Sequence, residues 1–469
     1  MLPILLILTA AFAVLTWSDL HKGLFVLVAV LPSYLLRTEI FGIPTTLLEL
    51  LVVTFLIVWM VRRSPVPPIP KEWVAATIVF VFLVATISVF VAPDMTAALG
   101  VWKAYFLEPI LLFFVVRYEL KHAPTPPNPL FDRELRVERP SGRGGTLAEQ
   151  LFVALGVSAL ILSLVAILQW LTGMGLPIPW DIERRVTSVF DYPNALGLFL
   201  GPIVIIGITT LLSHFSGVTD GAEAPEKHLF SLLSRFSGVS DWAKAPLNFF
   251  WIAVAGLSSI SIILAQSEAA IVSIIATLLV ASLVHRRTRS ISLILLVLLT
   301  LLTLLTPPLL SKLTLQDYSG EVRLSQWSET VDLLRDHWFL GAGLSGYPIV
   351  MEPYHKATHF EIFQYPHNII LNIWVELGLL GVIAFVLLAL IIVRRVAPKL
   401  PPSLKLRGAG KPGATFSSTI AFLALLQMTI HGLVDVPYFK NDLAILTWIL
   451  LAIIFAYARP ASTSKTSRS

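Results

Sequence analysis

Residues 73–92 read WVAATIVFVFLVATISVFVA, a stretch without a single charged side chain. A hydrocarbon core about 30 Å thick is crossed by about 20 apolar residues in an α-helix, because each residue adds about 1.5 Å. Within such a helix every backbone polar group is paired internally, as a lipid environment demands. This stretch therefore predicts a membrane-spanning helix.

Apolar stretches of this kind recur along the whole chain. The 469 residues are 56% hydrophobic and 13% charged, with a mean hydropathy of +0.81. Soluble domains carry about 25% charged residues, so the composition excludes an ordinary soluble enzyme. We predict an all-α polytopic membrane protein with about 12–13 transmembrane helices, the first two short enough to form one re-entrant pair. The predicted segments lie near 2–17, 22–37, 44–61, 73–92, 97–117, 149–171, 188–212, 247–265, 269–284, 290–309, 368–393, 415–434 and 441–458.

Basic residues gather in loops that fall on one side of the membrane if the segments alternate. These loops are 62–71, 117–148, 285–287 and 394–411. The positive-inside rule makes that side cytoplasmic, and it accounts for the net charge of +5 without nucleic acid as a partner. Thirteen spans place the N-terminus outside and twelve place it inside. We expect the first helix to be retained, because no basic n-region precedes it.

Two loops on the opposite side are the candidates for function. The first is 173–187, and the second is 311–366, which is far longer than a connector needs. The longer loop is expected to be partly helical, because one apolar stripe steps through it by three and four residues. The members of the stripe are Leu324, Trp327, Val331, Leu334 and Trp338.

Arg184 and Arg185 stand in the first of these loops. Basic residues on the outer side run against the positive-inside bias, so they need another reason. The guanidinium group is a planar fork of donors that matches phosphate oxygens and stays charged at any relevant pH. Binding of a phosphate is one interpretation, and snorkelling to lipid headgroups is the other.

The second loop contains two further candidate groups. Arg323, Gln326 and Thr330 fall on one polar face of the predicted helix, which is either a binding face or simply solvated. Where the loop re-enters the membrane, His367 and Asn368 follow a proline. A histidine at the water boundary suits proton transfer or phosphate contact, although it is equally compatible with a plain interfacial residue.

Metal binding is not expected. His355 and His359 are four residues apart, but no glutamate follows the first and no third ligand stands at a telling distance. The chain contains no cysteine, so thiolate sites and disulfides are excluded as well. The costly polar residues inside the predicted membrane segments either line a cavity or form structural pairs. They are Glu49, Lys103, Glu108, Glu268, Glu376, His431 and Asp435.

Taken together, these motifs resemble the O-antigen ligase and polymerase superfamily of membrane glycosyltransferases. The resemblance is carried by GEVRLSQW at 320–327, FLGAGL at 339–344, PHN at 366–368 and ELGLLG at 376–381. Arg184-Arg185 ahead of YPN at 192–194 matches the family's earlier arginine loop. In one departure, QSE at 266–268 stands where many members carry a Ser-Arg pair, so no basic role is assigned there.

The resemblance implies transfer of a glycan from a polyprenyl-diphosphate donor, such as undecaprenyl diphosphate, at the outer face of the bacterial inner membrane. It is typical of lipopolysaccharide and cell-envelope polysaccharide biosynthesis, with no cofactor, no metal and no nucleic acid, and with membrane lipids as surroundings. The implied domains are a transmembrane bundle at 1–310, an extracytoplasmic catalytic loop at 311–366, and C-terminal helices with a cytoplasmic tail at 367–469.

Roles follow for the candidate residues. Arginines stabilise the charge that gathers on a diphosphate leaving group, so Arg323 and Arg184 or Arg185 are expected to bind it. His367 and Glu321 compete for the role of the base that deprotonates the acceptor hydroxyl. Trp327 and Asn368 are expected to support the site.

The acceptor stays open. Lipid A-core would make the protein a ligase, a growing glycan a polymerase, and a Ser or Thr side chain a protein glycosylase. A transporter or flippase is the alternative from another class. Transporters concentrate polar residues at mid-membrane in related halves, whereas the polar candidates here cluster in one aromatic-rich outer loop, which favours the enzyme.

Overall fold

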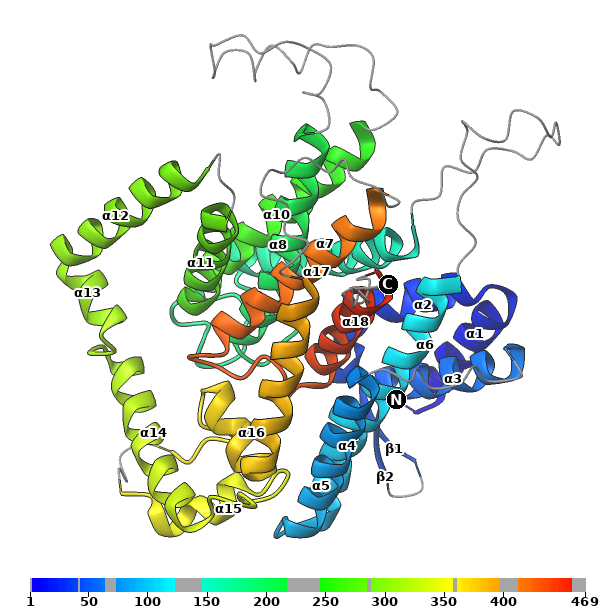
Figure 1. Cartoon of the computed structure of the whole chain (residues 1–469), viewed down its shortest axis with the longest axis horizontal. Helices are drawn as coiled ribbons and strands as arrows, with labels where there is room; N and C mark the ends of the chain where they lie inside the picture. The colour runs from blue at the N-terminus through cyan, green and yellow to red at the C-terminus, as the bar shows by residue number, and fades with distance from the viewer. Residues whose placement is uncertain are drawn as a thin grey trace, which may run out of the picture.

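The computed structural model describes residues 2–40, 43–63, 73–122, 146–216, 245–284, 288–356, 361–396 and 412–457. Nearly all of them are helical, which confirms the predicted all-α class (Figure 1). The first half of the chain contains α1 (Leu2–Ser18), α2 (Leu20–Ala29), the 3-10 turn η1 (Leu31–Leu35), α3 (Leu47–Arg62), α4 (Trp73–Val91), α5 (Met95–Trp102), the π-turn η2 (Lys103–Leu107), α6 (Glu108–His122), α7 (Leu147–Thr172) and α8 (Pro193–Ser216).

The second half contains the helices that carry most of the candidate residues. They are α10 (Ala245–Leu264), α11 (Glu268–Val284), α12 (Arg289–Leu305), α13 (Pro307–Leu313), α14 (Tyr318–Asp336), α15 (Tyr347–Met351), the 3-10 turn η5 (Glu352–Tyr354), α16 (Ile369–Val396), α17 (Pro412–His431) and α18 (Asn441–Tyr457). In Figure 1, α12, α13 and α14 follow one another along one edge of the molecule. Most of the loops that set the predicted orientation lie outside the described residues, as does His359.

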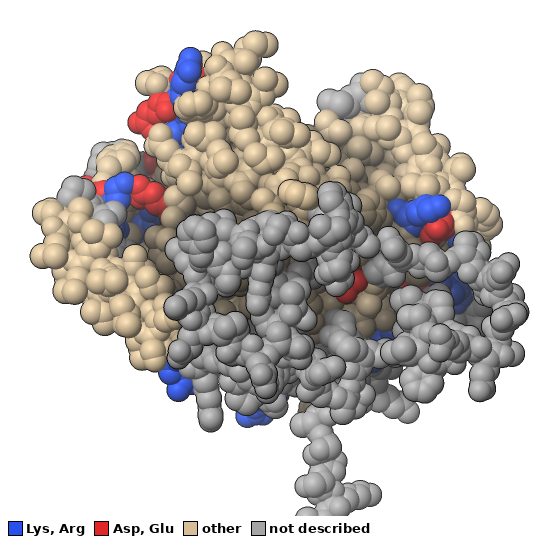
Figure 2. All heavy atoms as spheres, turned by 90° about the horizontal axis from the view of Figure 1, so that it is seen from above, with Lys and Arg blue, Asp and Glu red and all other residues tan. Residues whose placement is uncertain are grey.

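Six helical stretches are long and apolar enough to cross a membrane. They are Trp73–Val91, Met95–His122, Leu147–Thr172, Pro193–Ser213, Leu247–Leu264 and Ile369–Val396. The remaining apolar helices of the described chain, α17 among them, are 10–17 residues long over their apolar part. Seen from above (Figure 2), the part of this face that is not drawn in grey carries charged side chains in a few small groups, some of them Lys and Arg alone, between uncharged areas.

The second predicted segment, 22–37, differs from the structure. The helix α2 ends at Ala29, and the chain continues through η1 into an antiparallel hairpin of β1 (Arg37–Ile40) and β2 (Ile43–Thr46). Pro32 stands at the start of η1, and Thr46 and Glu49 then form a capping box that starts α3. Local turn and cap chemistry therefore outweighs hydropathy in this region.

The core of the bundle surrounds α18. Almost every side chain from Asn441 to Phe455 is buried, and the neighbours of α18 include α6 and α17. By contrast, α12 exposes almost all of its leucines and isoleucines, as expected of a helix that faces lipid.

A break in α16 holds the loop that follows α14. Gly378 lies inside α16 with φ of +68°, and an added Cβ there would collide with the carbonyl oxygen of Phe339. The Ala342 amide donates to the Val375 carbonyl at 2.7 Å, and the Ser345 amide donates to the Glu376 carboxylate at 2.6 Å. The FLGAGL and ELGLLG motifs therefore fit into each other.

Candidate functional site

The polar face of α14 is buried rather than solvated. Gln326 and Thr330 are 7% and 0% exposed, whereas Leu324 and Val331 of the apolar stripe are 46% and 42% exposed. The Thr330 hydroxyl lies 2.8 Å from the Tyr347 hydroxyl, which accounts for its burial. Leu334 of the same stripe is 4% exposed, so the stripe is divided between the inside and the outside of the structure. Because Gln326 and Thr330 are buried, a solvated face is excluded for both.

Two side chains of α14 hold the backbone that precedes His367. Gln326 Nε2 donates to the Tyr365 carbonyl at 3.0 Å, and Trp327 Nε1 donates to the Pro366 carbonyl at 2.8 Å. His367 itself has φ of +44°, a left-handed conformation that costs energy for a residue with a side chain. Trp327 thus supports the site by fixing the main chain.

Asn368 secures the other side of the histidine. Its Oδ1 accepts from the amides of Ile370 and Leu371 at 3.0 and 3.1 Å, which caps the first turn of α16. Its Nδ2 donates to the Leu433 carbonyl at 3.0 Å. The histidine is therefore held between a restrained turn and a capped helix.

A buried carboxylate faces His367 from the turn between α17 and α18. His367 Nδ1 lies 3.5 Å from Asp435 Oδ1, an ion-pair distance that is long for a hydrogen bond. Burial alone raises the pKa of Asp435, but attraction to His367 and His431 outweighs it and lowers this pKa to about 2. The charged form of Asp435 is therefore favoured, and it can orient the imidazole with Nε2 left to accept a proton.

His431 is the third member of this group. It ends α17, is 1% exposed, and neither of its ring nitrogens has a hydrogen-bond partner within the described protein. The charges of Asp435 and Arg323 both act on its ring. Asp435, from the 432–440 turn, therefore lies beside His367 and acts electrostatically on His431, which also experiences the charge of Arg323 on α14.

A pair of tyrosines joins the outer loops. The Tyr192 hydroxyl lies 3.0 Å from the Tyr365 hydroxyl, and the Lys440 ammonium lies 4.2 Å from the centre of the Tyr192 ring. The pKa of Lys440 is lowered, because the effect of burial outweighs the charges of Asp442, Asp435 and Asp191, which raise it. The end of the 173–192 loop therefore reaches the His367 segment.

The side chains of Arg323 and Glu321, both on α14, differ in their hydrogen bonds. Arg323 Nη1 bonds to its own helix, at 3.2 Å from Ser319 Oγ, and the rest of the guanidinium has no hydrogen bond within the described residues. Glu321 is exposed and has neither a hydrogen bond nor an ion pair from its side chain to the described part of the chain. In this structure Glu321 does not orient Arg323.

The arginines of the first loop lie beside helix ends. Arg185 Nε donates to the Ala265 carbonyl at 3.2 Å, and its guanidinium stacks 4.9 Å from the centre of the Trp180 ring. Arg184 has φ of +50° and contacts the Trp170 carbonyl at 3.5 Å. Burial lowers the pKa of Arg185, but a guanidinium remains charged regardless. Within the described residues, neither arginine hydrogen-bonds or ion-pairs with Arg323 or His367.

The spacing of His355 and His359 raised the question of a metal ion, but in the structure His355 contacts a carboxylate. Its Nδ1 lies 3.1 Å from Glu329 Oε2, a carboxylate that also accepts from the Lys356 amide at 2.8 Å. A small pocket of about 10 Å³ lies between Gln326, Glu329, His355 and Phe363, room for about one water. Over the described ranges, no group of three or more His, Asp or Glu side chains could hold a metal ion.

Some of the polar residues inside the predicted spans form structural contacts, and others lie at the candidate site. Lys103 pairs with Glu49 at 3.2 Å, and Glu376 receives the Ser345 amide, so these three are structural. His431 and Asp435 instead lie at the candidate site. Hydropathy had marked both as costly residues, but no local signal pointed to Lys440 or to the Tyr192–Tyr365 contact.

The comparisons with known proteins agree with the motifs. Residues 253–386 match the model of a family described as O-antigen ligase, while the search of curated proteins found no match. The matched part runs from α10 into α16 and contains Arg323 and His367, but neither Arg185 nor Asp435. The match confirms the resemblance to the O-antigen ligase and polymerase superfamily. It indicates a multi-pass protein of the inner membrane that transfers glycan in the manner of an O-antigen ligase.

Proposed function

We propose that this protein transfers a glycan from a polyprenyl-diphosphate donor to an acceptor hydroxyl at the outer face of the bacterial inner membrane, in the manner of an O-antigen ligase. We base this on the match to O-antigen ligases over residues 253–386 and on the contact between Asp435 and His367 beside that region, with the charge of Arg323 acting on the neighbouring His431. An arginine can stabilise the leaving diphosphate, and a histidine oriented by a carboxylate can act as the base.

His367 is the proposed base. The acceptor hydroxyl gives its proton to Nε2 while its oxygen forms a bond to the anomeric carbon of the donor sugar. The bond between that carbon and the phosphate oxygen breaks at the same time, and the diphosphate leaves with the bonding electrons. Asp435, 3.5 Å from Nδ1, stabilises the imidazolium that results. Glu321 is the weaker candidate for the base, because it is exposed and unsupported.

Arg323 is the proposed ligand of the diphosphate. Most of its donors are unused by the described chain, so the fork is available to phosphate oxygens. One such donor to a developing charge is worth about 3 kcal/mol of barrier, or about a hundredfold in rate. Arg184 or Arg185 is the proposed second cation, with Tyr192 linking their loop to the histidine.

The test is transfer from a purified polyprenyl-diphosphate glycan by the full-length protein and by Arg323→Ala, Arg323→Lys and Arg335→Ala. Arg335 is the matched control, because it lies on the same helix but pairs with Asp332 on an exposed side. We expect about a hundredfold loss in Arg323→Ala and a substantial loss in Arg323→Lys, since a point charge lacks the fork. Full activity of Arg323→Ala would refute the diphosphate site.

The same assay distinguishes the acceptors. Transfer to lipid A-core supports a ligase, chain growth a polymerase, and labelling of a protein hydroxyl an oligosaccharyltransferase. We expect activity to persist in a strong chelator, because the proposed chemistry uses arginine rather than a metal ion. Movement of the lipid-linked glycan across the membrane without transfer would instead show a flippase.

The orientation is tested by labelling. The chain has no cysteine of its own, so one introduced at exposed Glu352 on η5 reports the location of that loop. We expect an impermeant thiol reagent to label it from outside, and a cysteine at Arg394 to be labelled only after the cells are opened. The reverse pattern would invert the proposed topology.

A further inference from the structure

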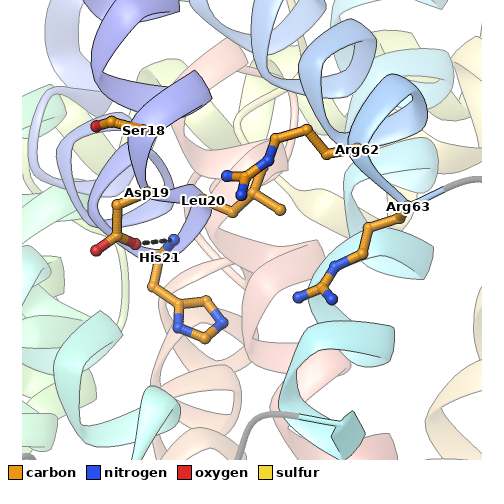
Figure 3. Close-up of a pocket in the computed structure, with 6 residues that line it drawn as sticks. All are labelled: Ser18, Asp19, Leu20, His21, Arg62 and Arg63. Atoms are coloured by element: carbon orange, nitrogen blue, oxygen red, sulfur yellow. Dashed lines mark hydrogen bonds between the residues drawn. The ribbon is translucent and has the colours of Figure 1, made fainter.

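A second polar site lies where the turn between α1 and α2 meets the end of α3. A pocket of about 220 Å³ is lined there by Ser18, Asp19, Leu20, His21, Arg62 and Arg63 (Figure 3). Figure 3 shows both guanidinium groups directed toward the start of α2. The pocket shares no residue with the candidate active site.

One wall of this pocket is built by a buried carboxylate. Glu119 of α6 is 1% exposed and accepts from Arg63 through Nε at 3.1 Å and Nη2 at 3.0 Å. It also accepts from Trp59 Nε1 at 2.8 Å and lies 3.3 Å from His21 Nε2. These contacts fix Arg63 and His21 in place, so the wall is preformed rather than a chance meeting of surface side chains.

The unbalanced charge of the pocket is positive. Arg63 is neutralised by Glu119, and Asp19 is engaged by the amides of His21 and Lys22 and by the Lys22 ammonium at 3.7 Å. Arg62 is exposed and forms no hydrogen bond or ion pair with the described part of the chain. Its complete set of donors, together with the unused Nη1 of Arg63, therefore favours an anion that offers several oxygens.

The surroundings indicate a lipid. Trp17, Met60 and Val61, next to the lining residues in sequence, are 56%, 52% and 59% exposed. An exposed tryptophan beside arginines is typical of the membrane–water boundary. Drug-sized ligands occupy pockets of about 300–1,000 Å³, so a smaller phosphate headgroup suits this one, with its chains against the apolar rim.

We infer that this pocket binds the phosphate headgroup of an anionic phospholipid. The two arginines belong to the side that the sequence predicts to be cytoplasmic, so the ligand comes from the inner leaflet. This site is separate from glycan transfer, and it does not depend on the function proposed above.

The experiment measures lipid bound to the full-length protein by native mass spectrometry. Phosphatidylglycerol and phosphatidylcholine with identical chains are titrated against the wild type, Arg62→Gln and Arg394→Gln. Arg394 is the matched control, an exposed arginine on the same predicted side but outside the pocket. Because Arg62 has no partner within the described residues, its loss should leave the fold intact, which thermal unfolding verifies.

We expect the wild type to prefer phosphatidylglycerol and Arg62→Gln to bind it about fivefold more weakly, with Arg394→Gln unchanged. Equal weakening in both variants would show general surface attraction and overturn the site. Equal binding of phosphatidylcholine would also overturn it. Displacement of phosphatidylglycerol by an equimolar amount of inorganic phosphate would show a site for free phosphate instead of lipid.

Discussion

Glu119 and Asp435 are both buried carboxylates that face a histidine, yet their surroundings differ. Glu119 accepts from Trp59 and twice from Arg63, in addition to its contact with His21. Within the part of the chain that the structure describes, Asp435 has the 3.5 Å contact with His367 and a bond from the amide of its neighbour Val436. Beside it, the buried His431 ring forms no hydrogen bond with the described residues.

The difference separates structure from function. A carboxylate with all of its partners in place holds elements together and gains nothing from a further ligand. Buried polar groups without partners cost about 1–3 kcal/mol each, and a ligand that supplies the missing partners removes that cost. We therefore expect changes around Glu119 to act on stability and changes around Asp435 to act on transfer.

The largest effect is expected at His367. His367→Ala should lower the rate by at least about a hundredfold, because a general base contributes about 10²–10⁴-fold. Its thermal unfolding should be about unchanged, because alanine carries the same Cβ at the strained φ of +44° and so neither relieves nor adds backbone strain. Transfer assays and unfolding curves on the same preparation test both parts.

The pH dependence distinguishes two roles for His367. A base must be neutral, so the wild-type rate should rise as the pH increases. A cationic phosphate clamp would give a rate that falls as the pH increases. A rate that changes by less than about twofold would contradict both roles.

The next effect belongs to Glu119. Glu119→Ala strips Arg63, His21 and Trp59 of their shared partner. We expect a loss of about 2–3 kcal/mol in the free energy of unfolding, less than for a fully buried pair because Arg63 is 42% exposed. Transfer per folded molecule should stay normal. If Glu119→Ala kept wild-type stability but lost activity, Glu119 would be a functional rather than a structural carboxylate.

Asp435→Asn should have an intermediate effect of about tenfold on the rate, equivalent to about 1.4 kcal/mol. The amide keeps the shape but loses the charge that stabilises the imidazolium. Without that charge the imidazole of the variant is protonated less readily, so its rate should begin to rise at a lower pH than the wild-type rate. Identical pH profiles for the two proteins would contradict the assignment.

Much of this architecture could be predicted from the sequence. Uninterrupted apolar stretches such as 73–92 predict helices on their own, because lipid leaves the backbone no alternative. The prediction of one membrane segment at 22–37 was wrong, because Pro32 and the Thr46 cap act over a few residues, which a hydropathy window does not resolve. The helix at 324–338 was predicted correctly in its main part, as α14, but the predicted stripe does not lie on one side, because Leu324 and Val331 are exposed while Leu334 is buried.

The candidate site was predictable only in part. Arg323, Trp327 and His367 lie within recognisable motifs of one loop. Asp435 and Lys440 reach the same place from a turn that follows α17, and Tyr192 reaches it from more than 170 residues away along the chain. Contacts between residues so far apart depend on helix packing, which a single sequence does not display.

The smallest effect is expected at Glu321, the competing base. Its side chain is exposed and forms no hydrogen bond or ion pair with Arg323 or any other described residue, whereas a catalytic base needs a partner that fixes its position. Glu321→Gln should therefore change the transfer rate by less than about threefold, or about 0.7 kcal/mol. Glu329→Gln provides the contrast, because Glu329 is 6% exposed and bound to His355 and the Lys356 amide, so its loss should destabilise the loop. A hundredfold loss in Glu321→Gln at normal stability would transfer the role of base from His367 to Glu321.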